Sequence, residues 1–401
     1  MHHHAAPAAL PTAARRRARL VLAAIVLPLL VATLIATWWL WPRGDSLIGS
    51  RALFSDESPP GVATVVGEPR TEAGITLADI ELETGESAGV RTTMQVPAEV
   101  AEHSISVGDQ VRVVFFPDQL ESGSPYVFYD FIRTAPMLWL AAGYLLVVVL
   151  VSRLRGMAAV VGLLASLGVI VFFVIPALMA GSPPVAVALT GSSLMMFFAV
   201  YLAHGISIRT TTALLGTFGG LAVTLGVGFW ALHAAHVTGT QSESGQFLHT
   251  ALPGLPLGDL ILCGVVIAGL GALNDVTITQ ASAVWELYGA NPAASKHELW
   301  RGGMRIGEDH IASTVYTLAF AYVGTALPVL LLAAMIDRPF VHILGAGEIA
   351  EEIVRTLVSS IGLVLAIPLT TAIAVALVHL APTRRDRRAG RRQNQQREGQ
   401  R

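Results

Sequence analysis

The sequence predicts an α-helical polytopic membrane protein with about eight transmembrane helices and a small β-barrel-like domain outside the membrane. The 401 residues are 53% hydrophobic and only 13% charged, whereas soluble domains carry roughly 25% charged residues. The apolar residues gather in long runs, and an α-helix needs about 20 of them to cross a bilayer. One stretch, residues 42–134, lacks such runs and instead alternates apolar and polar residues, which is typical of strands.

The first apolar run predicts a retained membrane anchor at residues 20–41. Four arginines between Arg15 and Arg19 precede it, and three tryptophans between Trp38 and Trp41 end it. Basic residues on the cytoplasmic side and aromatic residues at the interface are typical of a membrane helix. A signal peptide is the alternative, but the run exceeds the usual 7–15 apolar residues and no small-residue cleavage site follows. We therefore expect residues 1–19 to be a cytoplasmic tail.

Residues 42–134 predict an extracytoplasmic β domain, a small barrel of the oligonucleotide/oligosaccharide-binding type. The expected strands are Gly61–Val66, Ile75–Glu83, Val90–Val96, Gln110–Phe116 and Tyr126–Ile132. Strands this short bury a face only when several neighbours pair or a barrel closes. The segment from Arg43 to Arg133 contains 15 acidic residues and only 6 basic ones. This excess of negative charge would repel a phosphate backbone. Nucleic acid is therefore excluded as a partner, and a solvated acidic surface is the simplest interpretation.

Residues 135–381 predict a seven-helix transmembrane domain. Its apolar runs are Met137–Val151, Met157–Met179, Val185–Ala203, Thr211–Leu232, Gly258–Val284, Ile311–Ile336 and Thr356–Leu380. Basic residues fall in alternate loops, at 153–155, 209 and 296–305, and in the basic tail 382–401. Because Lys and Arg mark cytoplasmic loops, we expect both termini in the cytoplasm. The basic tail is also suited to contact anionic membrane lipids.

A polar block interrupts the run Gly258–Val284 and is the first candidate site. Asp275, Thr279, Ser282 and Glu286 lie within roughly 60° of one another on a helix of 100° per residue. Such a stripe should face protein or water, so we expect Asp275 to be shielded from lipid. It is either a polar site between helices or a set of interhelical hydrogen bonds that fixes packing.

A second polar cluster opens the next predicted span. Its members lie on two neighbouring helix faces and are Asp309, His310, Ser313, Tyr316 and Thr317. A carboxylate, an imidazole and hydroxyls near the inner membrane surface are groups suited to a proton relay. The alternative is that Glu308 and Asp309 only cap a helix N-terminus.

The two polar runs, Gly271–Leu287 and Gly303–Leu318, resemble the YibE/F family of bacterial multi-pass membrane proteins. The resemblance extends from roughly Gly61 to Leu380, and it implies the same architecture in a bacterial cytoplasmic membrane. Glu308 stands where the family commonly has Arg, and Tyr316 where it commonly has Asn, so no charge-dependent role is transferred to these two positions. The resemblance brings no biochemical activity with it.

The polar groups favour a secondary transporter or permease for a small ion or solute. The predicted site comprises Asn274, Asp275, Thr279, Gln280, Ser282, Glu286, Asp309, His310 and Ser313. A non-transporting scaffold or assembly protein, whose barrel engages an extracytoplasmic protein partner, is the alternative. The sequence holds no nucleotide-binding loop, paired-histidine zinc motif or nucleophile elbow, and Cys263 is the single cysteine. We therefore expect no enzymatic activity, no metal and no cofactor.

Cysteine substitutions test the predicted topology. Cysteines at Asp45 and Glu121 should react with an impermeant thiol reagent on intact cells. Cysteines at Arg155, Lys296 and Arg401 should react only after the membrane is opened, because these positions are expected in the cytoplasm. Labelling of Lys296→Cys from outside would overturn the predicted orientation.

Overall fold

The computed structural model describes residues 12–43, 48–49, 60–72, 74–85, 87–122, 124–337 and 339–378. Within these residues, eight helices are long and apolar enough to cross a membrane, which confirms the predicted number. The chain forms two compact units, Leu47–Val151 and Met1–Ser46 with Ser152–Arg401. The predicted basic tail, most of the predicted N-terminal tail and the acidic positions 45, 56, 57 and 86 lie outside the described residues.

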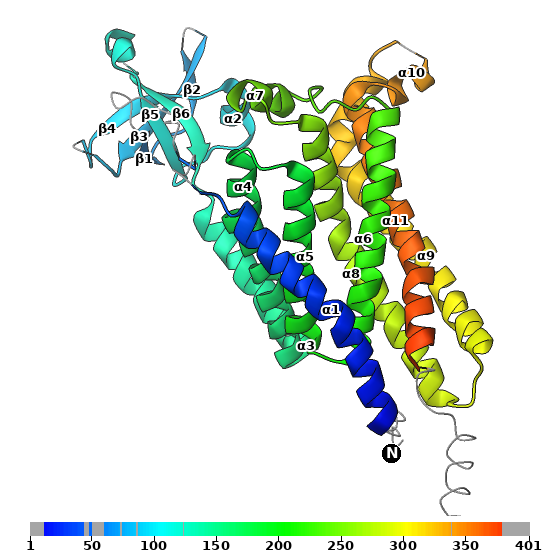
Figure 1. Ribbon diagram of the computed structural model, residues 1–401. Coiled ribbons are helices and arrows are strands. Elements are labelled where there is room, and N and C mark those ends of the chain that lie inside the picture. The colour runs from blue at the N-terminus through cyan, green and yellow to red at the C-terminus, as the bar shows by residue number, and fades with distance from the viewer. Residues whose placement is uncertain are drawn as a thin grey trace, which may run out of the picture. The chain divides into compact units, whose positions relative to one another are not determined.

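The first unit contains the predicted small barrel. Its described strands are β1 (Pro60–Val65), β2 (Arg70–Glu72), β3 (Ile75–Leu82), β4 (Arg91–Gln95), β5 (Gln110–Phe115) and β6 (Tyr126–Phe131). Five of them close a ring in the order β1-β5-β6-β4-β3-β1, and β2 forms a hairpin with β3 (Figure 1). The β4–β6 pair is parallel, and the others are antiparallel. A short helix, α2 (Ala98–His103), connects β4 to β5, and a 3₁₀ turn, η1 (Pro117–Ser122), connects β5 to β6.

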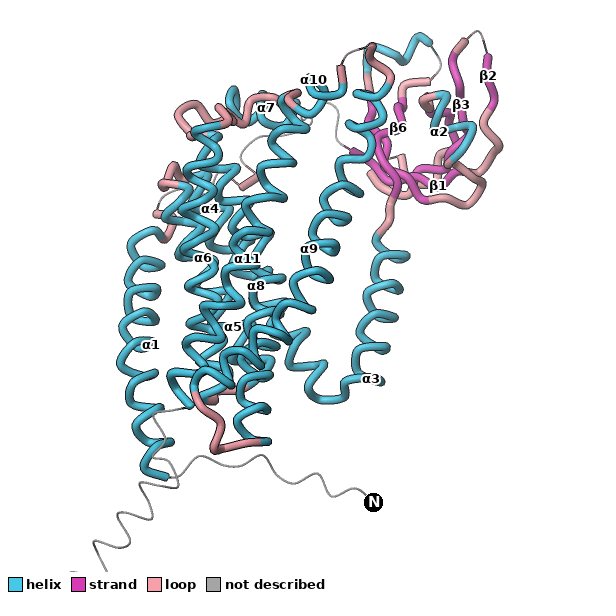
Figure 2. The backbone as a smooth tube through the Cα atoms, turned by 90° about the vertical axis from the view of Figure 1, so that its right-hand side faces the viewer, coloured by secondary structure: helices cyan, strands magenta, loops and turns pink. Residues whose placement is uncertain are grey.

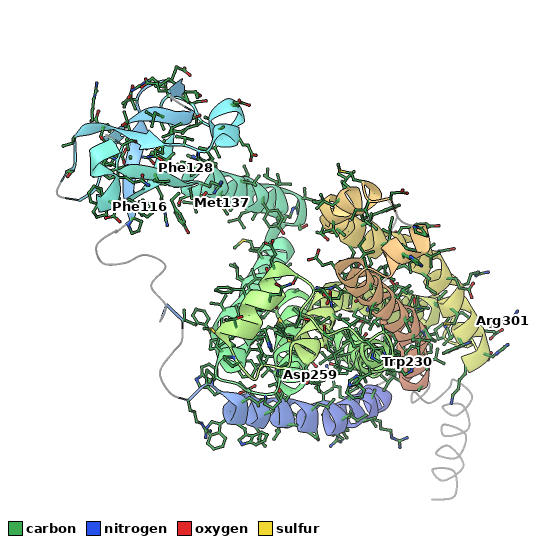
Figure 3. All side chains as sticks on the ribbon, turned by 90° about the horizontal axis from the view of Figure 1, so that it is seen from above. Phe116, Phe128, Met137, Trp230, Asp259 and Arg301 are labelled. Carbon is green, nitrogen blue, oxygen red and sulfur yellow. The ribbon has the colours of Figure 1, made fainter. Side chains whose placement is uncertain are left out.

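The barrel is held together by its apolar interior. Every second residue of β3 points inward, so that Ala78 and Ile80 are completely buried. Phe128, labelled in Figure 3, packs against this core from β6. Ion pairs such as Arg70–Asp79, with a 2.7 Å distance between Nη1 and Oδ2, lie on the exposed side. Exposed pairs contribute about 0–1 kcal/mol each, so apolar burial provides most of the stability.

Ile80 and Ile75 give a matched test of this core. Residues 61–133, expressed alone, should give a cooperative β spectrum by circular dichroism. In that fragment Ile80→Ala should lower the free energy of unfolding by about 2–5 kcal/mol, because it opens a cavity in the core. Ile75→Ala, on the same strand but 47% exposed, is the control and should have little effect. A predominantly helical spectrum would contradict the barrel.

The helix after the barrel is divided at Arg153. α3 (Thr134–Val169) contains this residue at φ 53° and ψ −137°, a backbone conformation that residues other than glycine rarely adopt. The spans Thr134–Leu154 and Gly156–Met179 therefore meet at a break. The first belongs to the unit with the barrel and the second to the other unit. The boundary between the compact units thus falls within α3, at residues 151–152.

The second unit is a helix bundle. Its further described elements are α1 (Thr12–Leu40), the π-helical turn η2 (Ile170–Val174), α4 (Ile175–Met179), α5 (Pro184–His204), α6 (Ile208–Ala234), α7 (Glu243–Ala251), α8 (Leu257–Ala290), α9 (Lys296–Ala334), α10 (Phe340–Leu344) and α11 (Gly347–Val378). The start of α1 lies at the same end of the bundle as the α5–α6 and α8–α9 turns, whereas α7 and α10 lie at the opposite end (Figures 1 and 2). The basic positions Arg209 and Lys296 therefore lie at one end, as the loop charges predict.

Glycines bring the central helices α6, α8 and α11 into close contact. A Cβ atom on Gly220 of α6 would lie 2.7 Å from Leu273 Cδ2 of α8 and 2.8 Å from Ala366 Cβ of α11. A Cβ atom on Gly216 would collide with the Thr370 hydroxyl of α11. Because such distances are too short for real contacts, only glycine fits at these positions. The small residues of α6 thus serve helix packing, as is common in membranes.

Candidate intramembrane site

The polar residues of α8 divide between two faces of the helix. Thr277 and Gln280 are buried in the bundle, whereas Asp275 and Glu286 are exposed. Three others, Asn274, Thr279 and Ser282, are half-buried. The polar block of the sequence therefore contains two sets of side chains in different environments.

Gln280 joins three helices. Its Nε2 donates a hydrogen bond of 2.8 Å to the Gly303 carbonyl of α9 and one of 2.7 Å to the Thr371 hydroxyl of α11. The side chain is only 1% exposed. It fits because Gly307 leaves room: a Cβ atom there would lie 2.5 Å from Ile367 Cγ2 and 3.1 Å from Gln280 Oε1. Of the two interpretations of the polar block, interhelical hydrogen bonds that fix packing are therefore what the structure shows at Gln280.

A pair of threonine hydroxyls makes a similar link between α6 and α8. Thr217 and Thr277 lie 2.6 Å apart, oxygen to oxygen, and both are fully buried. One hydroxyl donates to the other, and the one that accepts donates in turn to a carbonyl of its own helix, Ala213 for Thr217 or Asn274 for Thr277. Such local bonds are common for hydroxyls in helices. These two residues therefore fix the packing of α6 against α8.

Asp275 lies near the middle of α8 and away from these links. At 1.5 Å per residue it is about 27 Å from Leu257 and about 22 Å from Ala290. Its side chain is exposed on the bundle, so the bundle does not provide the shielding that the sequence predicts. Its carboxylate has no ion-pair partner among the described residues, whereas Glu286 on the same helix lies 3.3 Å from Arg209 of α6.

Asn274, next to Asp275, lines a cavity of about 380 Å³ between α3, α5 and α8. Most of the lining is apolar, with Met195, Met196 and Ile267 among it, and Ser166 and His204 add polar groups. The Asn274 Oδ1 atom is buried and has no hydrogen-bond partner in the described part of the chain. A largely apolar cavity with a few convergent polar groups is the usual form of a small-molecule site.

The second polar cluster lies inside a helix rather than at its start. α9 begins at Lys296, where Ser295 and Glu298 form a reciprocal capping box. Glu308 and Asp309 lie in the fourth turn, so the alternative that they cap a helix N-terminus is wrong. Asp309, Ser313 and Tyr316 are exposed together, as expected for one helix face, and His310 is half-buried.

The two clusters lie at one depth but are not joined. α8 and α9 are antiparallel, and Gln280 contacts Gly303 and approaches Gly307. Asp275 lies five residues from Gln280, away from the α8–α9 turn. On α9, the same distance from the level between Gly303 and Gly307 leads to His310, so Asp275 and His310 lie at the same depth. Asp309, however, is two residues from both Gly307 and Ile311, which pack toward α8 and α11. At 100° per residue it lies on the opposite side of α9, so Asp309 and Asp275 do not share a pocket.

Eight described spans and unpaired polar side chains at mid-helix define a polytopic helical membrane protein with an attached β-barrel. The chain belongs to the YibE/F-like protein family, whose model matches residues 140–380. This match covers both polar runs and the bundle helices after α1, and it leaves out the barrel. No curated protein and no solved structure matches the chain.

Gly307 and Gly324 test whether α9 is held against Gln280. Gly307→Ala should lower the unfolding temperature of the protein in detergent, because the added Cβ meets Ile367 at 2.5 Å and pushes α9 away from α11. Gly324→Ala, on the same helix, is the control, since nothing lies within 4 Å of its Cβ position. Alanine favours helices over glycine by roughly 0.5–1 kcal/mol, so the control should be unchanged or slightly more stable. Equal unfolding temperatures for both variants would contradict the junction.

Proposed function

We propose that the protein is a secondary transporter or permease whose site includes Asn274 and Asp275. The observation that carries this proposal is the Asp275 carboxylate at mid-helix, unpaired in the described structure. Its neighbour in the chain, Asn274, lines a cavity and has a buried Oδ1 atom without a hydrogen-bond partner among the described residues. A charged side chain at the centre of a membrane helix costs about 2.5–3.5 kcal/mol on insertion scales. Intramembrane ionisable residues of this kind mark ion and solute pathways.

The chemistry of the site favours a small cationic solute or a proton. Asp275 can neutralise a positive charge or take up a proton, and the Asn274 carbonyl can accept a hydrogen bond from the solute. His310 lies level with Asp275, and its imidazole can donate a hydrogen bond from one ring nitrogen and accept one at the other. Gln280 and Thr277 would not contact the solute, because their hydrogen-bonding groups are engaged between helices.

Thr279, Ser282 and Glu286 extend the polar stripe from Asp275 toward Arg209. We propose that this end of the bundle faces the cytoplasm of a bacterial cell and that both termini lie there. Arg209 and Lys296 at the same end as the start of α1 support this orientation. The proposal involves movement of a solute and no chemical conversion of it. Asp309 and Ser313, on the face of α9 that is turned away from α8, are not included in this site.

A flux comparison followed by one substitution tests the proposal. A strain lacking the protein and the same strain with it restored are compared for uptake and efflux across a panel of inorganic ions and small organic solutes. For any solute that differs, Asp275→Asn should reduce the flux at least tenfold, because the amide keeps the shape but cannot carry charge or titrate. Asp259→Asn, at the start of the same helix, is the control and should keep most of the flux.

Wild-type flux through Asp275→Asn would defeat the site assignment. If no solute in the panel differed between the two strains, the alternative of a non-transporting scaffold, with a protein partner bound to the barrel, would be favoured instead.

A further inference from the structure

Three polar residues of α11 form a second unexplained group, at the end of the bundle that carries α10. Glu351, Arg355 and Ser359 are spaced four residues apart and so lie on one stripe of the helix. Each has a buried atom without a hydrogen-bond partner in the described residues: Glu351 Oε1, Arg355 Nε and Ser359 Oγ. Ser359 is only 2% exposed, about 18 Å along the helix from Gly347.

This stripe faces bare backbone on α8. Arg355 Nη1 lies 3.8 Å from the position that a Cβ on Gly264 would take, and Ser359 Oγ lies 3.6 Å from the corresponding position on Gly269. The backbone N–H of Gly239 is directed at the Glu351 carboxylate. No side chain of α8 fills the space beside these polar atoms at Gly264 and Gly269.

Three carboxylates and one guanidinium set the charge around this group. Glu352 Oε2 lies 3.5 Å from Arg355 Nε, which is an ion-pair distance but too long for a hydrogen bond. Glu351 adds a second negative charge, and Glu348 a third at the first turn of α11. Asp259, His233 and His236 line a separate pocket of about 280 Å³ at the start of α8. The first three turns of α11 therefore carry an excess of negative charge.

Water is the simplest partner for these three atoms. A buried polar group without a hydrogen bond costs about 1–3 kcal/mol, and bridging waters remove most of that penalty. The residues rise by about 6 Å from one to the next along the axis, a spacing that one or two hydrogen-bonded waters span. An acceptor, a donor and a hydroxyl in succession suit such a series.

We propose that Glu351, Arg355 and Ser359 line a hydrated path, open to protons and small monovalent cations and closed to anions. It leads from the α10 end of the bundle to Gly269 of α8. The excess of carboxylates selects the sign of the ion, and the glycines of α8 provide the opposite wall. This path does not depend on the transport proposed above, because it concerns access of water and ions to α11 and uses none of the Asn274–Asp275 site.

Accessibility of introduced thiols to small ions tests the path in the full-length chain in membranes. Cys263, which is buried, is first replaced by alanine, and Ser359→Cys is then exposed to silver ion, a small cation that binds thiols. Reaction rates are normalised to those of the unfolded chain. We expect Ser359→Cys to react with silver ion at least tenfold faster than either of two neighbouring controls, and faster than with an anionic sulfonate-bearing thiol reagent.

The two controls lie at the same depth as Ser359 on other faces of α11. Val358→Cys is buried against α6, and Leu357→Cys is on an exposed apolar face, the native side chains being 1% and 56% exposed. Gly269→Cys probes the same path from α8 and gives a second measurement should Ser359→Cys fold poorly. Added to Ser359→Cys, Glu351→Gln should slow the silver reaction several-fold. Rates at Ser359→Cys and Gly269→Cys no higher than in the controls, or a preference for the anionic reagent, would overturn the proposal.

Discussion

The close approach of α6, α8 and α11 is the constraint on which the rest of the bundle depends. Lipid tails are as apolar as leucine, so membrane helices associate through tight packing and hydrogen bonds rather than through the hydrophobic effect. Gly220 allows both Leu273 and Ala366 to reach the α6 backbone. Gln280 then adds α9 through its bond to the Gly303 carbonyl. α9 also packs apolar side chains, among them Met304, Ile311 and Leu318, against α8 and α11.

This packing sorts the polar groups of α8 by task. Thr277 and Gln280 are buried against neighbouring helices and form hydrogen bonds with them, Thr277 with α6 and Gln280 with α11. Asn274 lines the cavity between α3, α5 and α8, and Asp275 is exposed on the side of α8 opposite to Thr277 and Gln280. The same logic holds on α11, where Thr371 serves packing while Arg355 and Ser359 keep polar atoms without protein partners in the described chain. Side chains of one chemical type thus form interhelical hydrogen bonds on one face and, on another, keep polar atoms without protein partners among the described residues.

Much of the architecture could be predicted because its signals are local. The alternation of apolar and polar residues in β3 and the long apolar runs of the membrane helices both depend only on residues that are adjacent in the sequence. The apolar pattern places the start of this helix, α9, too late, at Ile311, because Arg301 and Arg305 are typical of a loop. Ser295 and Glu298, a capping-box pair, mark the true start in the sequence. The break at Arg153 has no sequence signal, since its positive φ is unusual for arginine. The helical period of 100° per residue groups Asp275 with Thr279, Ser282 and Glu286 on one face of the helix. It does not predict which face of α8 packs against α11.

The stability of two variants of α8 tests most directly the claim that this helix divides structural from available polar groups. Thermal unfolding of the purified protein in detergent should be unchanged by Asp275→Asn, because that carboxylate has no ion-pair partner in the described structure. Gln280→Leu should lower the stability by about 1–2 kcal/mol, because it removes two buried interhelical hydrogen bonds. A loss of stability in Asp275→Asn as large as that in Gln280→Leu would contradict this division.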